Sequence, residues 1–126
     1  MILALFFAAA ATAAAPACFD TPIQPALNAC AGNEFKKADA RLNALYRQLM
    51  SRYDAPNQAL LKAAEQKWIA WRDAECDYET NASVGGTVHP MTVALCWTQK
   101  TNKRIEELKG QRDCGDGDLS CNPPDK

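Results

Sequence analysis

The residues of this chain best suited to acid–base chemistry lie in the segment "RDAECDYE", where Asp73, Glu75, Asp77 and Glu79 alternate with other residues. Two carboxyl groups that face one another can act as general acid and general base. Residues two apart on a helix, however, point to different sides of it. These acids are therefore a poor catalytic dyad, and we interpret them as part of a negatively charged surface.

A nucleophilic centre would have to use His89, the only histidine of the chain, with a hydroxyl group such as that of Ser83. No strand–turn–helix pattern surrounds this serine, as it would in a nucleophile elbow. The cysteines are expected to pair with one another, which leaves no free thiolate as nucleophile. The sequence therefore predicts a protein that is not an enzyme.

Metal binding has little support in the sequence. One histidine and oxidised cysteines leave only oxygen ligands. The stretch "DCGDGD" at residues 113–118 resembles the start of a calcium loop, but the later ligands and the closing glutamate are missing. We expect a solvated turn there, and no metal ion or other cofactor.

The segment that precedes these residues is typical of export. Residues 1–17, "MILALFFAAAATAAAPA", contain no charged side chain and end in small residues, as a secretory signal does. The segment is too short to cross a bilayer, which takes about 20 helical residues. Cys18 follows directly, so a lipid anchor there is the alternative, although Ala15 stands where a bacterial lipobox has leucine. We expect a periplasmic or secreted protein with no transmembrane span.

The rest of the chain is enough for one domain, which we expect over residues 18–110, followed by a polar tail over residues 111–126. With 14 basic and 15 acidic residues, the chain is nearly neutral. That balance argues against nucleic acid as the partner.

The apolar residues of the first half recur with helical spacing. Over residues 31–49 they follow one another at intervals of four and three residues, which places them on one helix face. Pro25 suits the first turn of this helix, where its missing N–H costs nothing. The turn at residues 54–57 ends it, because Pro56 stops one helix and can begin the next. We therefore expect a helix over about residues 25–53.

The second helix is expected to bury its tryptophans. Trp68 and Trp71 fall on one side of it and should face the first helix as core residues. The same side carries Leu61, Ala64 and Tyr78.

A loop and a third helix should follow. Residues 80–90, "TNASVGGTVHP", have a Gly-Gly pair, a closing proline and no helical period, so we predict a loop. The third helix is expected from about Met91 to Gly110, where glycine is a natural stop. The fold predicted is therefore all-α: an antiparallel helical hairpin plus a third helix, stapled by disulfides, with a short irregular C-terminal tail.

The hairpin suggests a partner for Arg72. Counting from the turn brings Asp39 level with Arg72, and Asn43 level with Trp68. We predict that Arg72 pairs with Asp39 between the helices, flanked by the tryptophans, because a half-buried charge needs a partner. The pair would fix the register of the hairpin more than it would stabilise the fold.

The cysteines predict three disulfides, because an even number in a small exported chain is typical of a disulfide framework. They are Cys18, Cys30, Cys76, Cys96, Cys114 and Cys121. We favour Cys18–Cys30, Cys76–Cys96 and Cys114–Cys121, the second of which would clamp the loop. Cys30–Cys76 stays open as an alternative, because these two lie at similar distances from the turn.

Several stretches, in this order, match a known pattern: "LNACA" (27–31), "ADARLNALY" (38–46), "KAAEQKWIAWRDAEC" (62–76), "GGTVHP" (85–90) and "CWTQKTNKRIEEL" (96–108). In these stretches the chain resembles the LprI-type family of lysozyme-inhibitor-like domains. The resemblance implies a secreted or periplasmic, disulfide-bonded helical domain, and the family is named for inhibition of lysozyme. Two features depart from it: Ala26 stands near a position where the family often has glutamate, and the Cys114–Cys121 tail lies outside the family pattern.

These observations favour a binding module. The acids lie near the end of the second helix, where the Gly-Gly loop begins, and a basic partner such as a lysozyme would be steered to that end. The residues predicted to contact a protein partner are Asp73, Glu75, Asp77, Ser83, Gly85, Gly86, Thr87 and His89. Two alternatives remain: the acids form only a solvated face, or the domain docks another envelope component without inhibiting lysozyme.

Overall fold

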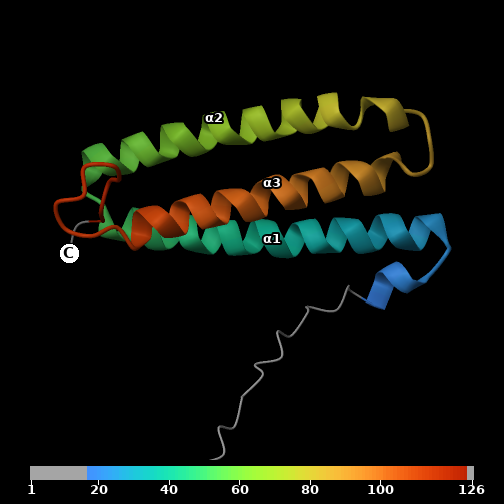
Figure 1. Ribbon diagram of the computed structural model, residues 1–126, viewed down its shortest axis with the longest axis horizontal. Helices are drawn as coiled ribbons and strands as arrows, with labels where there is room; N and C mark the ends of the chain where they lie inside the picture. Colours follow the sequence, from blue (N-terminus) through green and yellow to red (C-terminus); the bar gives the residue numbers. More distant parts are fainter. Residues whose placement is uncertain (1–16, 125–126) are drawn as a thin grey trace, which may run out of the picture.

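The computed structural model describes residues 17–124, which form three α-helices and two short 3-10 helices, with no strand among them. The α-helices are α1 (Gln24–Arg52), α2 (Ala55–Glu79) and α3 (His89–Arg112), and the 3-10 helices are η1 (Ala17–Asp20) and η2 (Asn81–Ser83). Figure 1 shows the α-helices side by side, with α2 antiparallel to α1 and α3. The predicted all-α fold is confirmed. The predicted signal segment, apart from Ala17, lies outside the described residues.

The starts of α1 and α2 follow from local chemistry. Each helix has a proline in its first turn, Pro25 in α1 and Pro56 in α2, where no intrahelical N–H bond is lost. Asp54 caps α2, because its carboxylate accepts a hydrogen bond from the backbone N–H of Asn57 at 3.0 Å. The predicted limits of α1, about residues 25–53, are correct to within one residue.

Replacing Asp54 by alanine should lower the free energy of unfolding by about 0.5–2 kcal/mol, because the Asn57 N–H loses its acceptor. Asp54→Asn is the matched control and should stay close to wild type, since an asparagine side chain caps equally well. Urea unfolding followed by circular dichroism measures both variants. Equal losses in the two would show that the carboxylate acts in another way.

The limits of α3 differ from the prediction. The helix begins at His89 rather than Met91, and it continues through Gly110 to Arg112. Gly110 does not end the helix, because only Gly85 and Gly117 among the described glycines have a positive φ. None of the helices in residues 17–124 has the length and hydrophobicity needed to cross a bilayer.

The hydrophobic core lies mainly between α1 and α3, which make the most extensive helix contact of the described chain. Its buried members are Leu42, Leu45, Leu49, Tyr53, Ile105 and Leu108. From α2, only the partly buried Leu61 and Trp68 pack against this cluster. The second helix is therefore attached to the α1–α3 pair by few apolar contacts.

The core stripe predicted for α2 is only partly correct. Trp68 packs on the core, but Trp71 and Tyr78 are 50% and 78% exposed. The buried residues of α2 are Glu65, Arg72 and Cys76. Together with Trp68 they recur every three or four residues, so charged residues occupy part of the stripe that faces the other helices. A hydrophobic pattern cannot reveal such a stripe.

The predicted Arg72–Asp39 pair is wrong. Arg72 pairs instead with the neighbouring Asp73, at 2.9 Å, and its side chain is 9% exposed. Asp39 accepts a hydrogen bond from Asn43 at 3.3 Å. Both residues line a groove that also contains Ile69, and Ile69 lies about one turn of α2 before Arg72.

Aromatic rings surround the Arg72 guanidinium. Its central carbon lies 5.3 Å from the ring centres of Phe35 and Trp68, and 5.9 Å from that of Trp97. The Phe35 and Trp97 rings are themselves 5.1 Å apart. Cation–π attraction therefore stabilises the charge at the meeting point of the three helices, where we expected a carboxylate.

A buried ion pair joins α2 to α3. Both Nη2 and Nε of Arg104 lie within 2.6 Å of the same carboxylate oxygen of Glu65. The side chains of Glu65 and Arg104 are only 9% and 17% exposed. Arg104 also contacts Glu107 at 3.1 Å, but that carboxylate is half exposed.

Two predicted disulfides are confirmed. Cys76–Cys96 joins the end of α2 to α3, with the Cα atoms 5.8 Å apart, and this bond rules out the alternative Cys30–Cys76 pairing. Cys114–Cys121 closes the tail. Cys30 is also disulfide-bonded, but the side chain of its predicted partner, Cys18, lies outside the described part.

The tail is irregular, as predicted, but it is held in place. Asn122 is its anchor: its carbonyl accepts a hydrogen bond from the Tyr53 hydroxyl at 2.6 Å, and its N–H donates to Gln111 at 2.8 Å. Its side chain also donates to Asn57 at 3.0 Å. The tail therefore closes the end of the bundle where α1 turns into α2 (Figure 1).

Candidate functional site

The connection between α2 and α3 stands at the end of the bundle opposite the tail (Figure 1). We call residues 80–88 the α2–α3 loop. The observed connection is shorter than the loop predicted over residues 80–90, because His89 already belongs to α3. It is also less irregular than predicted, because residues 81–83 form η2. Its tip is open to solvent: Val84 is 63% exposed, and Gly85, Gly86 and Thr87 are also exposed.

A cluster of hydroxyl groups ties the two ends of the loop together. The Ser83 hydroxyl lies 2.8 Å from each of the Thr80 carbonyl, His89 Nδ1 and the Thr92 hydroxyl. The Thr92 hydroxyl in turn donates to the His89 carbonyl at 2.9 Å. Because a serine has one proton to donate, its oxygen accepts from at least one of these neighbours. The cluster thus fixes the His89 ring through Nδ1 and leaves Nε2 as the ring nitrogen that a partner can contact.

The loop is also bound to the start of α1. The Asn28 side chain donates a hydrogen bond to the Thr87 carbonyl at 2.9 Å, and Gln24 donates to the Asn28 side-chain oxygen at 2.8 Å. Gly85 has φ of 84°, a conformation that suits glycine, and a Cβ on Gly86 would lie 3.2 Å from the Ser83 carbonyl. The backbone conformation therefore favours glycine at position 85, whereas a side chain at position 86 would require a small shift of the Ser83 carbonyl.

The Ser83–His89 contact has the length of a nucleophile–base pair. The surroundings of this contact differ from those of a catalytic pair, because the same serine oxygen also contacts Thr80 and Thr92. No carboxylate among the described residues orients the His89 ring, as one does in a catalytic triad. The arrangement can hold a loop in one conformation.

Two of the predicted acids are engaged in ion pairs. Asp73 pairs with Arg72 at 2.9 Å, and Glu79 pairs with Lys100 at 2.7 Å. Glu75 is partly buried, and Asp77 is exposed. The acidic end of α2 is therefore less negative than the sequence suggested.

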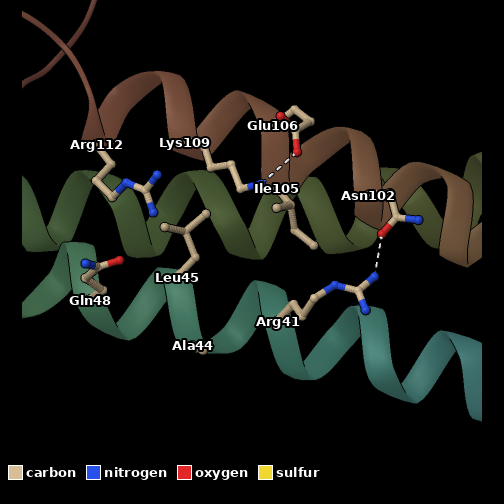
Figure 2. A pocket seen from close by; sticks show the side chains of 9 residues that line it. All are labelled: Arg41, Ala44, Leu45, Gln48, Asn102, Ile105, Glu106, Lys109 and Arg112. Carbon is tan, nitrogen blue, oxygen red and sulfur yellow. Dashed lines mark hydrogen bonds and ion pairs between the residues drawn. The ribbon is translucent and has the colours of Figure 1, made fainter. Parts of the chain in front are cut away.

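A groove that the sequence did not indicate lies between α1 and α3, with a volume of about 640 Å³. Figure 2 shows Leu45 and Ile105 on its floor, with Arg41, Lys109 and Arg112 reaching toward it from the two helices. Helices that are not consecutive in the chain form it, which is why sequence reasoning missed it.

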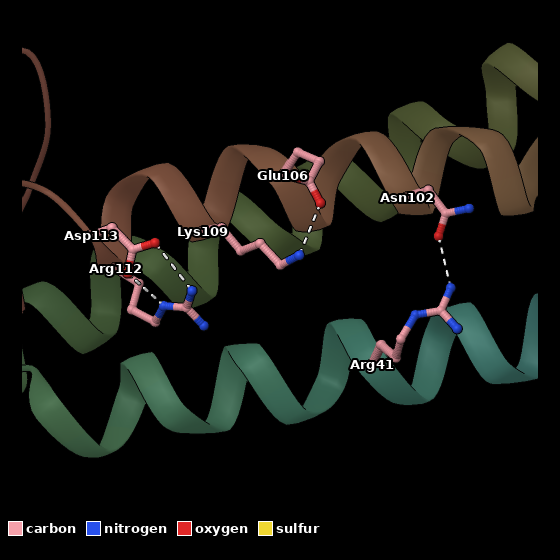
Figure 3. Close-up of polar contacts among 6 residues, drawn as sticks. All are labelled: Arg41, Asn102, Glu106, Lys109, Arg112 and Asp113. Atoms are coloured by element: carbon pink, nitrogen blue, oxygen red, sulfur yellow. Dashed lines mark hydrogen bonds and ion pairs between the residues drawn. The ribbon is translucent and has the colours of Figure 1, made fainter. Parts of the chain in front are cut away.

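The cations of the groove already have partners, as Figure 3 shows. Arg41 donates to Asn102 at 2.9 Å, and Lys109 pairs with Glu106 at 3.0 Å. Arg112 pairs with Asp113 at 2.8 Å. The guanidinium holds the pKa of the Asp113 carboxyl below its usual range, and the carboxylate raises the pKa of Arg112. The groove is thus mildly basic at most.

The tail contains one group of residues with metal-ligand types. Ligand atoms of Cys114, Asp118 and Cys121 lie within 4.8 Å of one another. The two cysteines form a disulfide, so they are not thiolate ligands. The Asp118 carboxylate accepts hydrogen bonds from the Ser120 hydroxyl and N–H, which lower its pKa. These contacts build a closed turn in the segment that resembled a calcium loop.

Comparison with known proteins gives consistent matches. A family model described as lysozyme inhibitor LprI matches residues 15–108. An uncharacterized protein of Rhizobium meliloti strain 1021 is 34% identical over 107 residues, covering 75% of this chain and 77% of that one. The crystal structure of a DUF1311 family protein from Pseudomonas putida KT2440 superimposes with a TM-score of 0.62, at 28% identity, over 67% of this chain and 88% of that one.

Proposed function

Since the chain belongs to the family described as lysozyme inhibitor LprI, we propose that it is an exported protein of the bacterial envelope that inhibits a lysozyme by direct contact through the α2–α3 loop. The observation that carries this proposal is the fixed shape of an exposed loop. Because the loop is ordered before binding, little conformational entropy is lost when a partner takes it up.

Three kinds of contact support the loop as the inhibitory element. The Ser83 cluster joins its ends, and Asn28 holds Thr87 from the side. The Cys76–Cys96 disulfide fixes the helices from which the loop leaves. The apolar side chain of Val84 then stands 63% exposed on a rigid base. A small apolar tip on a rigid base fits a concave cleft.

The chemistry of a lysozyme cleft suits His89. A lysozyme uses two carboxyl groups at its catalytic centre. With Nδ1 held by Ser83, the imidazole offers Nε2 to such a group, and a protonated ring would add a charge-assisted hydrogen bond. Asp77, which is exposed, and Glu75 are the remaining acids that could steer a basic lysozyme toward this end.

Replacing Val84 by aspartate should weaken inhibition at least about tenfold, because a charge at the tip of the loop would be desolvated in the cleft. The assay measures lysis of cell walls by several lysozymes in the presence of the oxidised protein. Leu119→Asp is the matched control, because Leu119 is 99% exposed on the tail at the other end of the molecule. It should inhibit like wild type, and both variants should keep the helical circular dichroism spectrum.

Two outcomes contradict this proposal in different ways. Equal inhibition by Val84→Asp and wild type would exclude the loop tip as the contact surface. No inhibition of any lysozyme by the wild-type protein in excess would remove the inhibitor function. It would leave the alternative of an envelope module that binds another exported protein or the cell wall.

A further inference from the structure

One face of α2 carries a stripe of exposed residues with few contacts inside the described chain; the ring of Trp71, its central aromatic residue, has the Lys100 ammonium 5.7 Å from its centre. Residues 60, 64, 67, 71, 74 and 78 follow one another at intervals of four and three, so they lie along one face of the helix. All of them are exposed, and the large members Leu60, Trp71 and Tyr78 are 65%, 50% and 78% exposed. We call these residues the outer stripe. Its spacing is that of the contact seam of a coiled coil.

The outer stripe is complementary to itself when read in the opposite direction. An antiparallel copy centred on residue 69 would place Leu60 opposite Tyr78, and Lys67 opposite Trp71. Leucine packs well on an aromatic ring, and a lysine ammonium is attracted to the face of an indole. The same register places two alanines, Ala64 and Ala74, opposite each other, so the backbones can approach closely.

The charges of α2 favour the same antiparallel arrangement. Its first half carries the basic Lys62 and Lys67, while its second half carries Glu75 and Asp77, the two acids there that are not paired with Arg72 or Lys100. An antiparallel copy brings each basic half beside an acidic half, whereas a parallel copy would set like charges side by side. Helical side chains lean toward the N-terminus of their helix. Lys67 therefore leans toward the place where Glu75 of the second copy would lie.

We propose that two copies of this protein form a twofold-symmetric dimer by antiparallel pairing of their outer stripes. Such an interface is closed, because each residue meets its counterpart by symmetry and no further copy can add. Residues 60–78 span about 27 Å of helix, so the contact is short and the dimer should dissociate on dilution. The α2–α3 loops then lie at opposite ends of the paired helices. This inference does not depend on the inhibitor function.

Sedimentation velocity of the oxidised protein at increasing concentration tests the dimer. The wild type should shift from monomer to dimer, and Lys67→Glu should weaken the association about tenfold or more, because it faces Glu75 of the second copy. Adding Glu75→Lys to Lys67→Glu exchanges the two charges and should restore association. Val84→Asp, at the loop tip, should associate like wild type. A wild type that stays monomeric, or a double variant no better than Lys67→Glu, would overturn the proposal.

Cross-linking distinguishes the two directions of pairing. Proteins carrying Ala64→Cys and Ala74→Cys would be mixed and oxidised, with each alone as control. The antiparallel dimer predicts a disulfide-linked dimer mainly in the mixture, since position 64 of one copy faces position 74 of the other. Efficient cross-linking of Ala64→Cys alone would instead indicate a parallel contact and would overturn the proposed arrangement.

Discussion

The variant Arg104→Ala should lose about 3–5 kcal/mol of the free energy of unfolding, since it leaves a buried carboxylate without its partner. Glu65 lies between α2 and α3 with its side chain 9% exposed, and its contacts with Arg104 are at 2.5 and 2.6 Å. The loss is the penalty for a buried unpaired charge, and it is larger than the net contribution of the ion pair itself. Urea unfolding of the oxidised protein, followed by circular dichroism, measures it.

A second ion-pair partner of Arg104, Glu107, provides the control. Arg104 also contacts Glu107, whose side chain is 52% exposed, and an exposed ion pair contributes about 0–1 kcal/mol. Glu107→Ala should therefore have a small effect. Replacing both members of the buried pair, as Glu65→Leu with Arg104→Met, should recover most of the stability, because no buried charge remains. If Arg104→Ala costs no more than Glu107→Ala, Glu65 is solvated and this account of the α2–α3 contact is wrong.

Removing the Cys76–Cys96 disulfide is the second change with a large expected effect. The double variant Cys76→Ala/Cys96→Ala should lose about 3 kcal/mol, because the bond closes a loop across 20 residues of sequence separation. Alanine is the suitable replacement, because the two cysteines are 0% and 7% exposed and a serine hydroxyl would be buried. Thermal unfolding of the variant against the oxidised wild type gives the loss.

The effect should be concentrated in α2. This helix buries few apolar side chains against the α1–α3 pair, so the disulfide holds one of its ends. Hydrogen exchange of amides in α2 and in the α2–α3 loop should become faster than exchange in α1 and α3. Cys114→Ala/Cys121→Ala is the comparison: its loop is shorter, its cysteines lie in the tail, and α2 should stay protected. Uniform acceleration across all three helices would mean that the Cys76–Cys96 bond stabilises the whole fold rather than α2.

The candidate site was only partly accessible from the sequence. The exposed Gly-Gly loop and its clamp by Cys76–Cys96 could be predicted, because a glycine pair and nearby cysteines are local features of the chain. The contact from Asn28 to Thr87 could not, since it joins residues 59 positions apart through a side chain that has no distinctive pattern. Pairing of Asp73 with Arg72 also changed the expected acidic surface.

The sequence by itself determined the positions of the helices and the family to which the chain belongs. Apolar spacing, the first-turn prolines and the Asp54 cap act within a few residues, so they set α1 and α2 without knowledge of the rest of the chain. The tertiary structure decided which side of α2 is buried. That side carries Glu65 and Arg72, which become favourable inside only when Arg104 and the rings of Phe35 and Trp97 are brought to them from other helices. The energy of a buried charge depends on partners distant in the chain, whereas apolar periodicity depends on neighbours alone.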